Sequence, residues 1–121
     1  MVHYRLQKEA KNAVKDQQSI LNQLIKIGQR TVFGKDHGLD KVSDYESFKQ
    51  AVPIRDYEGF KSYIELVKKG TPNVLWKGLP IYFAKTSGTT SGVKYIPITK
   101  DSISNHINGA RNAILTYMAT T

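Results

Sequence analysis

The sequence predicts an α/β fold that is mostly helical and that carries one strand–loop–strand unit. Apolar residues recur at helical spacing through the first part of the chain and again near its end. Two short runs rich in aromatic and β-branched residues, at 81–84 and 95–98, are typical of strands. We therefore expect a helical layer over residues 1–75, a strand–loop–strand unit over 80–98 and a helix over 100–118.

The first predicted helix runs from residue 4 to about residue 29. Gly28 stands near its end, where a C-terminal cap is expected. Residues 33–38 are rich in turn-forming residues and are predicted to connect this helix to the next one. The helix is indicated by apolar residues that lie on or near one of its faces: Leu6, Ala10, Val14, Leu21, Leu24, Ile25 and Ile27.

Three further helices are marked by the residues at their N-terminal ends. Ser43 and Glu46 have the spacing of a capping box, which opens a short helix. Asp56 is predicted to cap a helix over about 57–69, and Thr99 is predicted to cap the last one. The last helix carries an apolar stripe, made of Ile103, Ile107, Ala110, Ile114 and Met118.

The composition is that of a globular protein. The chain has 121 residues, of which 40% are hydrophobic and 23% charged, and a compact chain of this size buries roughly two-thirds of its unfolded surface. It contains no cysteine and its three histidines are scattered, so we predict no metal site. No apolar stretch approaches a membrane span, and the first residues lack a signal peptide's apolar segment. We expect a cytoplasmic protein without a membrane partner.

The formal net charge of +8 raises the question of nucleic-acid binding. The lysines are spread along the whole chain, and no zinc-finger spacing or basic run of five or more residues occurs. Basic residues on the outer faces of helices are usually solvated surface. We therefore expect no nucleic-acid partner.

The loop between the predicted strands is the strongest candidate for chemistry. Residues 86–94 read Thr-Ser-Gly-Thr-Thr-Ser-Gly-Val-Lys, so that backbone N–H groups, hydroxyls and one ammonium can face a single anion. The loop is not a Walker loop, because three residues separate Gly88 from Gly92 and Val93 precedes Lys94. A Ser/Thr/Gly cluster is also typical of a solvent-exposed turn, and the residues alone leave both interpretations open.

This loop resembles the phosphate loop of the acyl-adenylate-forming enzymes, whose first core motif reads Thr-Ser-Gly-Thr-Thr-Gly-x-Pro-Lys. The chain departs from it in two places, since Ser91-Gly92 replaces Gly-x and Val93 replaces the proline. The continuation over 95–99 is similar instead to the auxin-responsive promoter family of acyl acid–amido synthetases, in its bacterial branch. That resemblance covers most of the chain, through upstream blocks at 31–35, 45–49, 52–58 and 83–85.

The resemblance implies an ATP-dependent ligase that works in two half-reactions. A carboxylic acid is activated as an acyl adenylate with release of pyrophosphate, and an amine, commonly that of an amino acid, then takes the acyl group. The loop of such an enzyme binds the ATP phosphates, and the expected ligands are ATP and Mg²⁺. The implied phosphate-binding residues are Thr86, Ser87, Gly88, Thr89, Thr90, Ser91, Gly92 and Lys94.

The resemblance also implies an N-terminal fragment of a luciferase-like adenylation domain. Two strands are too few for a stable sheet without partners, and the last helix stays periodic to Met118 without a stop signal. We expect the remaining sheet, the acyl pocket and the C-terminal lid beyond residue 121. The catalytic residues, and those that bind adenine and Mg²⁺, are expected there too.

Two alternative functions stay open. An acyl-CoA synthetase would use the same loop chemistry with a thiol as acceptor. A small basic module would instead bind RNA or a partner protein through its helices. Outside the loop, we interpret Arg55 and Tyr57 as structural residues of the helical layer, and His106 as a packed or surface histidine.

Overall fold

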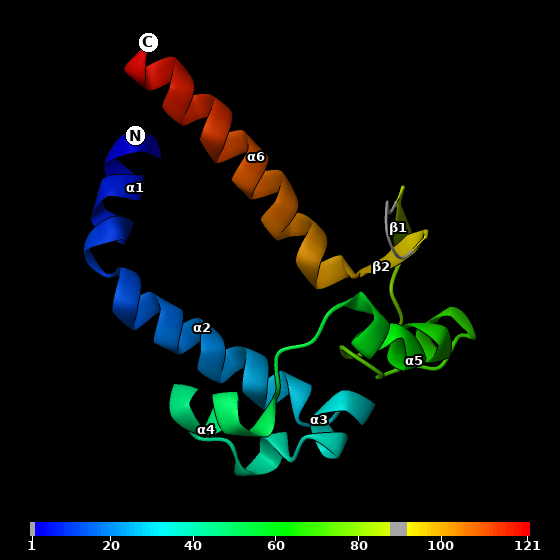
Figure 1. Cartoon of the computed structure of the whole chain (residues 1–121). Helices are drawn as coiled ribbons and strands as arrows, with labels where there is room; N and C mark the ends of the chain where they lie inside the picture. The colour runs from blue at the N-terminus through cyan, green and yellow to red at the C-terminus, as the bar shows by residue number, and fades with distance from the viewer. Residues whose placement is uncertain (1, 88–91) are drawn as a thin grey trace.

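The computed structural model describes residues 2–87 and 92–121, which are mostly helical (Figure 1). This confirms the mostly helical class with one strand pair, whereas the luciferase-like domain and its boundaries stay predictions. The elements, in chain order, are α1 (Val2–Lys11), α2 (Ala13–Gly28), α3 (Val32–Asp36), the 3₁₀-helix η1 (Leu39–Lys41), α4 (Tyr45–Ala51), α5 (Tyr57–Lys68), β1 (Tyr82–Thr86), β2 (Lys94–Ile98) and α6 (Lys100–Thr120).

The first predicted helix is in fact two helices. Asn12, with φ −107° and ψ 14°, separates α1 from α2, which agrees with the low helix propensity of asparagine. The apolar face is only partly buried, because Val14 is 84% exposed and Leu24 is 48% exposed, while Ile25 is buried. Figure 1 shows the reason: the N-terminal half of α2 extends away from the end of the molecule where α3, α4 and α5 gather.

Helix α3 occupies residues that we predicted as a turn-rich connection. Buried Thr31 caps it, because the Thr31 hydroxyl accepts the N–H of Gly34 at 2.9 Å and donates to the carbonyl of Gly28 at 2.7 Å. The cap is a signal that the sequence did contain. The third residue after Thr31 is glycine rather than the glutamate or glutamine of a capping box, so this cap does not match the familiar pattern.

The caps of the next two helices are local and were largely predictable. Helix α4 is confirmed, but its cap is Asp44 rather than Ser43, since the Asp44 carboxylate accepts the N–H of Ser47 at 2.8 Å. Hydrogen bonds from the Ser47 hydroxyl and backbone also lower the pKa of Asp44. Helix α5 begins after Asp56, as predicted, and the Asp56 carboxylate accepts the N–H of Gly59 at 3.1 Å.

The two strands form an antiparallel hairpin whose register runs from Tyr82↔Ile98 to Thr86↔Lys94. Strand β1 ends at residue 86 instead of the predicted 84, and β2 begins at residue 94 instead of the predicted 95. Strand β2 lies beside α5 and leads directly into α6, which the predicted cap Thr99 starts (Figure 1). The hairpin is therefore held between the end of the helical layer and the last helix.

The hydrophobic core is small, and its buried residues lie on α2, η1, α5 and the connection after α5. The total accessible surface is 9167 Å² for 13.6 kDa, against about 6,600 Å² for a compact monomer of that mass. The chain thus buries about half of its unfolded surface rather than the expected two-thirds. Among the described residues, no helix is long and apolar enough to cross a bilayer. The buried apolar residues are Ile25, Leu39, Ile64, Val67 and Val74.

Candidate functional site

The hairpin places Thr86 and Lys94 opposite each other, where the predicted phosphate loop begins and ends. Directly paired residues of an antiparallel sheet point to the same face, so these two side chains share one face of the hairpin. Ser87 is exposed, and Gly92 has φ 75°, a left-handed value that favours glycine. The other predicted loop residues lie outside the described residues, and their role stays a prediction: Gly88, Thr89, Thr90 and Ser91.

Tyr57, the first residue of α5, contacts both of the residues with which β2 begins. The Tyr57 hydroxyl oxygen accepts the backbone N–H of Tyr95 at 2.9 Å. The Tyr57 ring centroid lies 6.0 Å from Nζ of Lys94, at the outer limit of a cation–π contact. The sequence interpretation had assigned Tyr57 to the helical layer alone. No local pattern reveals this contact, since it joins residues 38 positions apart.

Lys68, a cation on α5, lies over the ring of Tyr95, the second residue of β2. Nζ of Lys68 is 4.5 Å from the ring centroid of Tyr95 and 2.9 Å from a carboxylate oxygen of Glu65. The hydrogen bond between these two side chains raises the pKa of Lys68 and lowers that of Glu65, so both are charged at neutral pH. Glu58 similarly pairs with Lys61, at 3.6 Å.

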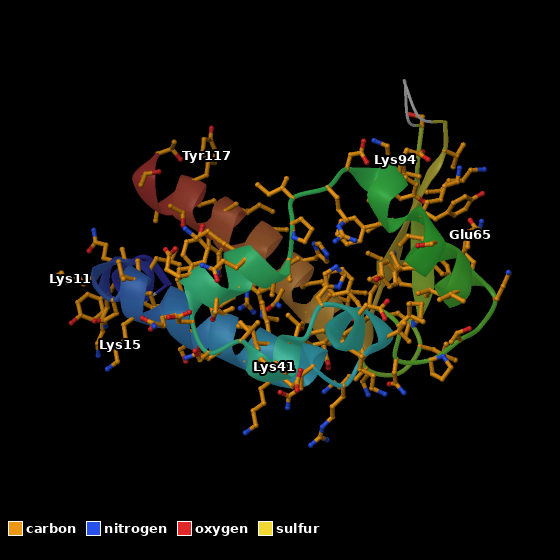
Figure 2. The ribbon with its side chains drawn as sticks, turned by 60° about the horizontal axis from the view of Figure 1, so that its bottom comes forward. Lys11, Lys15, Lys41, Glu65, Lys94 and Tyr117 are labelled. Carbon is orange, nitrogen blue, oxygen red and sulfur yellow. The ribbon has the colours of Figure 1, made fainter. Side chains whose placement is uncertain are left out.

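Among the residues that the structure describes, these pairings leave the ammonium of Lys94 without a carboxylate. Among the ion pairs of the described residues, none uses Lys94. Figure 2 shows Lys94 near the beginning of α5, with Glu65 farther along that helix. Within the described part of the chain, the positive charge of Lys94 thus lies at the end of the predicted loop, near the ring of Tyr57.

The remaining titratable side chains form no candidate metal centre in the described part of the chain. Residues 2–87 and 92–121 contain no cluster of three or more histidines and carboxylates that could hold a metal ion. His106 is exposed on α6, in agreement with its interpretation as a surface histidine. The prediction that catalytic residues lie elsewhere stays untested.

His37 and Arg55 join the C-terminal end of α3 to the segment before α5. Nη2 of Arg55 is 2.7 Å from Nε2 of His37, and Nδ1 of His37 is 2.7 Å from the carbonyl oxygen of Phe33. Because arginine only donates, Nε2 must accept and Nδ1 must carry the proton. The guanidinium also lies over the rings of Phe33 and Phe60, at 5.7 and 5.4 Å. The structural role predicted for Arg55 is consistent with this arrangement.

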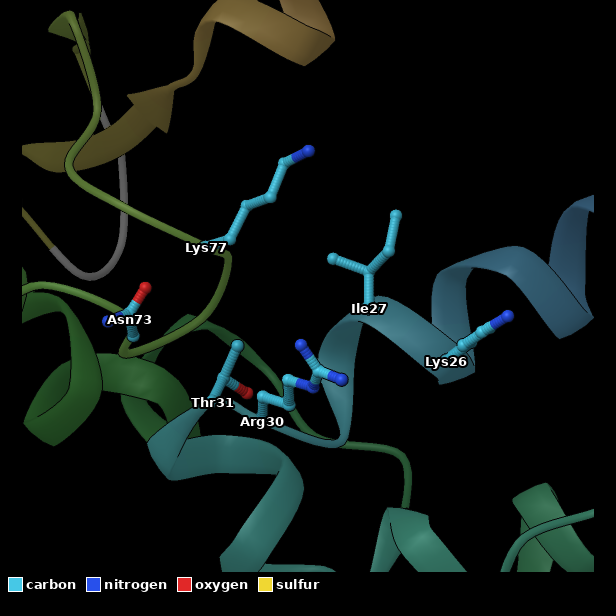
Figure 3. Close-up of a pocket in the computed structure, with 6 residues that line it drawn as sticks. All are labelled: Lys26, Ile27, Arg30, Thr31, Asn73 and Lys77. Carbon is cyan, nitrogen blue, oxygen red and sulfur yellow. The ribbon is translucent and has the colours of Figure 1, made fainter.

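Sequence reasoning missed a basic hollow at the C-terminal end of α2. Three cations from two distant segments surround it, and the segments meet only in the fold (Figure 3). Lys77 is already paired with Asp101, at 3.1 Å, whereas Arg30 and Lys26 have no carboxylate partner among the described ion pairs. The hollow measures about 430 Å³ and is lined by Lys26, Ile27, Arg30, Thr31, Asn73 and Lys77.

The family of the chain follows from a comparison of its whole length. A family model described as "GH3 family N-terminal domain" matches residues 2–121. The chain belongs to the GH3 family. This confirms the resemblance to the acyl acid–amido synthetases, while the bacterial branch stays a prediction. No solved structure gives a significant match to this GH3 chain.

Curated GH3 relatives are plant amido synthetases. The chain is 32% identical to the indole-3-acetic acid-amido synthetase GH3.15 of Arabidopsis thaliana, over 80% of the chain and 16% of the relative. It is 29% identical to the jasmonoyl–L-amino acid synthetase JAR4 of Nicotiana attenuata, over 75% of the chain and 16% of the relative. A shorter match joins it to the probable indole-3-acetic acid-amido synthetase GH3.13 of Oryza sativa subsp. japonica, at 39% identity over 47% of the chain and 13% of the relative. The chain thus spans about a sixth of the length of these relatives.

Proposed function

We propose that this GH3 chain supplies the ATP-phosphate-binding hairpin of an acyl acid–amido synthetase. The observation that carries the proposal is the pairing of Thr86 with Lys94 across the hairpin, at the two ends of the predicted loop. Membership of the GH3 family and the amido synthetases among its relatives support the reaction class.

The charge around the hairpin supports an anionic ligand. The ammonium of Lys94 has no carboxylate among the described ion pairs, so an incoming phosphate need not displace one. Thr86 adds a hydroxyl on the same face of the strand pair. Gly92 adopts a left-handed backbone conformation two residues before Lys94 and has no side chain that could block an anion there.

In the proposed reaction, a carboxylate oxygen attacks the α-phosphorus of ATP. The bond from that phosphorus to the α,β-bridging oxygen breaks, and pyrophosphate leaves with that oxygen. Lys94 and the loop would hold the β- and γ-phosphates, orient the α-phosphorus and neutralise the charge that builds on the leaving group. An amine then attacks the acyl carbon, loses a proton and releases AMP. The loop has no part in this second step.

We assign Mg²⁺ to the nucleotide phosphates and to residues other than the described ones. Mg²⁺ is usually bound by one or two carboxylates together with substrate phosphates. The described residues near the hairpin offer Glu65 and Glu58, and both are paired with lysines of α5. The adenine and acyl sites are likewise expected elsewhere in a protein of the relatives' length.

The experiment is a titration of the ¹⁵N-labelled chain with inorganic tripolyphosphate, a mimic of the ATP phosphates. We expect amide shifts at Thr86, Ser87, Gly92 and Lys94. Lys94→Met should weaken binding about tenfold to a hundredfold, the range expected for one charge-assisted contact. Lys85→Met is the matched control, because Lys85 neighbours Thr86 but belongs to the next cross-strand pair and points to the opposite face.

Other results of this titration would contradict the proposal. Shifts confined to Arg30 and Lys77 would place the anion in the basic hollow. Equal losses for Lys85→Met and Lys94→Met, or similar losses for many scattered lysines, would favour a small basic interaction module.

A second experiment uses a GH3 protein of the relatives' length that carries this hairpin. In that protein, Lys94→Ala should slow carboxylate-dependent ATP–pyrophosphate exchange. An enzyme that accepts only a thiol as acyl acceptor would favour the acyl-CoA synthetase alternative.

A further inference from the structure

We propose that Tyr57 positions the phosphate hairpin, with its hydroxyl fixing the backbone of β2 and its ring orienting the ammonium of Lys94. The inference rests on the proposed phosphate function and adds a residue outside the loop, on a different element. Tyr57 touches no phosphate in this arrangement. It acts through the two residues with which β2 begins.

The hydroxyl of Tyr57 accepts a backbone N–H from the edge of β2 that does not pair with β1. Strand β2 pairs with β1 along one edge only, so N–H groups on its other edge need a different partner. The Tyr57 oxygen accepts the N–H of Tyr95 at 2.9 Å, one residue after Lys94. This bond fixes how far β2 lies from α5, and with it the point from which the Lys94 side chain departs.

The ring of Tyr57 restricts the conformations of the Lys94 side chain without neutralising its charge. At 6.0 Å from the centroid, Nζ of Lys94 is attracted to the ring face but keeps its three N–H donors for an anion. A free lysine side chain must lose rotamer entropy when it binds phosphate. A contact that already narrows its conformations reduces that loss.

Tyr57 is itself held on a rigid base. It is the first residue of α5, directly after the cap Asp56. Two later residues of the same helix, Ile64 and Val67, are buried in the core at 4% and 6% exposure. A side chain on a docked helix holds a site more accurately than one on a loop. The core of the helical layer is thus connected to the loop through this tyrosine.

The first test separates the two contacts of Tyr57 by tripolyphosphate titration of the full chain. Tyr57→Phe keeps the ring and removes the acceptor of the Tyr95 N–H, and we expect about fivefold weaker binding, as for one hydrogen bond. The Tyr95 amide resonance should shift even without phosphate. Tyr57→Leu removes the ring as well, and we expect a further loss of about twofold to fivefold.

The second test asks whether the ring acts through Lys94. In the Lys94→Met background the ammonium is gone, so the affinities of Tyr57→Phe and Tyr57→Leu should differ by less than about twofold. The hydroxyl effect should persist, because it acts on the backbone. If the ring were merely structural, Tyr57→Leu would instead bind more weakly than Tyr57→Phe by the same factor in both backgrounds.

Tyr45 provides the matched control. It also has a lysine over its ring, Lys49 at 4.7 Å, but it lies on α4 and is 59% exposed. Tyr45→Phe and Tyr45→Leu should leave the affinity unchanged. If the wild-type chain binds tripolyphosphate at the loop and Tyr57→Phe and Tyr57→Leu bind equally well, the positioning role is wrong while the proposed function stands. If the wild-type chain binds none at the loop, the proposed function fails, and the positioning role fails with it.

Discussion

At the scale of single residues, the tightest constraint lies where α3 meets the end of α2. A Cβ at Gly34 would come within 2.0 Å of the carbonyl oxygen of Gly28 and 2.9 Å of the Cα of Gln29. These are backbone atoms of the helix end that also accepts the hydroxyl of Thr31, so they cannot move aside cheaply. Only glycine permits this approach, which brings Thr31 into its buried capping position.

A pair of glycine substitutions tests this constraint. Gly34→Ala should lower the free energy of unfolding by about 3 kcal/mol or more, because the clash is with backbone. Gly109→Ala is the control, since a Cβ at this helical position of α6 meets no atom within 4 Å. It should be neutral or should stabilise the helix by up to about 1 kcal/mol. Urea unfolding followed by circular dichroism measures both; equal stability of the two variants would refute the close approach.

The residues of the candidate site divide into those that a local pattern marks and those that only the fold brings together. Thr86 and Lys94 belong to one continuous motif, so the sequence could predict them. Tyr57 and Arg30 could not be predicted. Their partners are far away in the chain, and their own neighbours look like an ordinary helix start and helix end.

At the scale of elements, the start of α6 is tied to the connection that follows α5. Nε1 of Trp76 donates to the carboxylate of Asp101 at 3.0 Å, and Lys77 pairs with the same oxygen at 3.1 Å. Both contacts lower the pKa of Asp101, the Trp76 hydrogen bond more strongly. Asp101 lies in the first turn of α6, where a negative charge is also favoured by the helix dipole.

This contact predicts a pH dependence with a defined sign. Because the pKa of Asp101 is lower in the folded chain than its ordinary value of about 3.9, the contact contributes fully at neutral pH and is lost as the pH falls below that value. The chain has one tryptophan, so intrinsic fluorescence reports the change directly. We expect an emission shift of wild type on acidification below about pH 4.

Asp101→Ala is the matched variant for that titration. It removes the acceptor and should abolish the acid-dependent emission shift, although Asp44 and Glu65, whose pKa values are also lowered, still titrate. A shift of the same size in Asp101→Ala would mean that the fluorescence reports general acid unfolding and not this contact.

Elements with a side-chain cap of a familiar kind were predictable, and those defined by packing were not. Helices α5 and α6 begin directly after the predicted caps Asp56 and Thr99. The break at Asn12 could not be predicted, because the apolar periodicity continues across it. The same periodicity includes Val14, which is exposed, since the period alone does not say whether another element covers the face.

At the scale of the whole molecule, the chain is open. Helix α6 diverges from α2 in Figure 1, and α1 lies beside α6 near the two chain ends. The apolar stripe of α6 is mostly uncovered: Ile107 and Ile114 are each 61% exposed and Met118 is 68% exposed. Isolated exposed apolar residues are normal in proteins, but a stripe along one helix favours binding of apolar molecules and association.

The open form predicts measurable behaviour of the purified chain. We expect it to enhance the fluorescence of an exposed-hydrophobe dye and to sediment with a concentration-dependent mass, because the α6 stripe has no cover. Ile107→Lys with Ile114→Lys should reduce the dye signal by roughly half and favour the monomer. Asn105→Lys with Asn108→Lys adds the same charge at exposed polar positions of α6 and should change neither property. A wild-type chain that binds no dye and stays monomeric at all concentrations would show that the stripe is covered in solution, and the compact area of about 6,600 Å² would then describe it better than the open one.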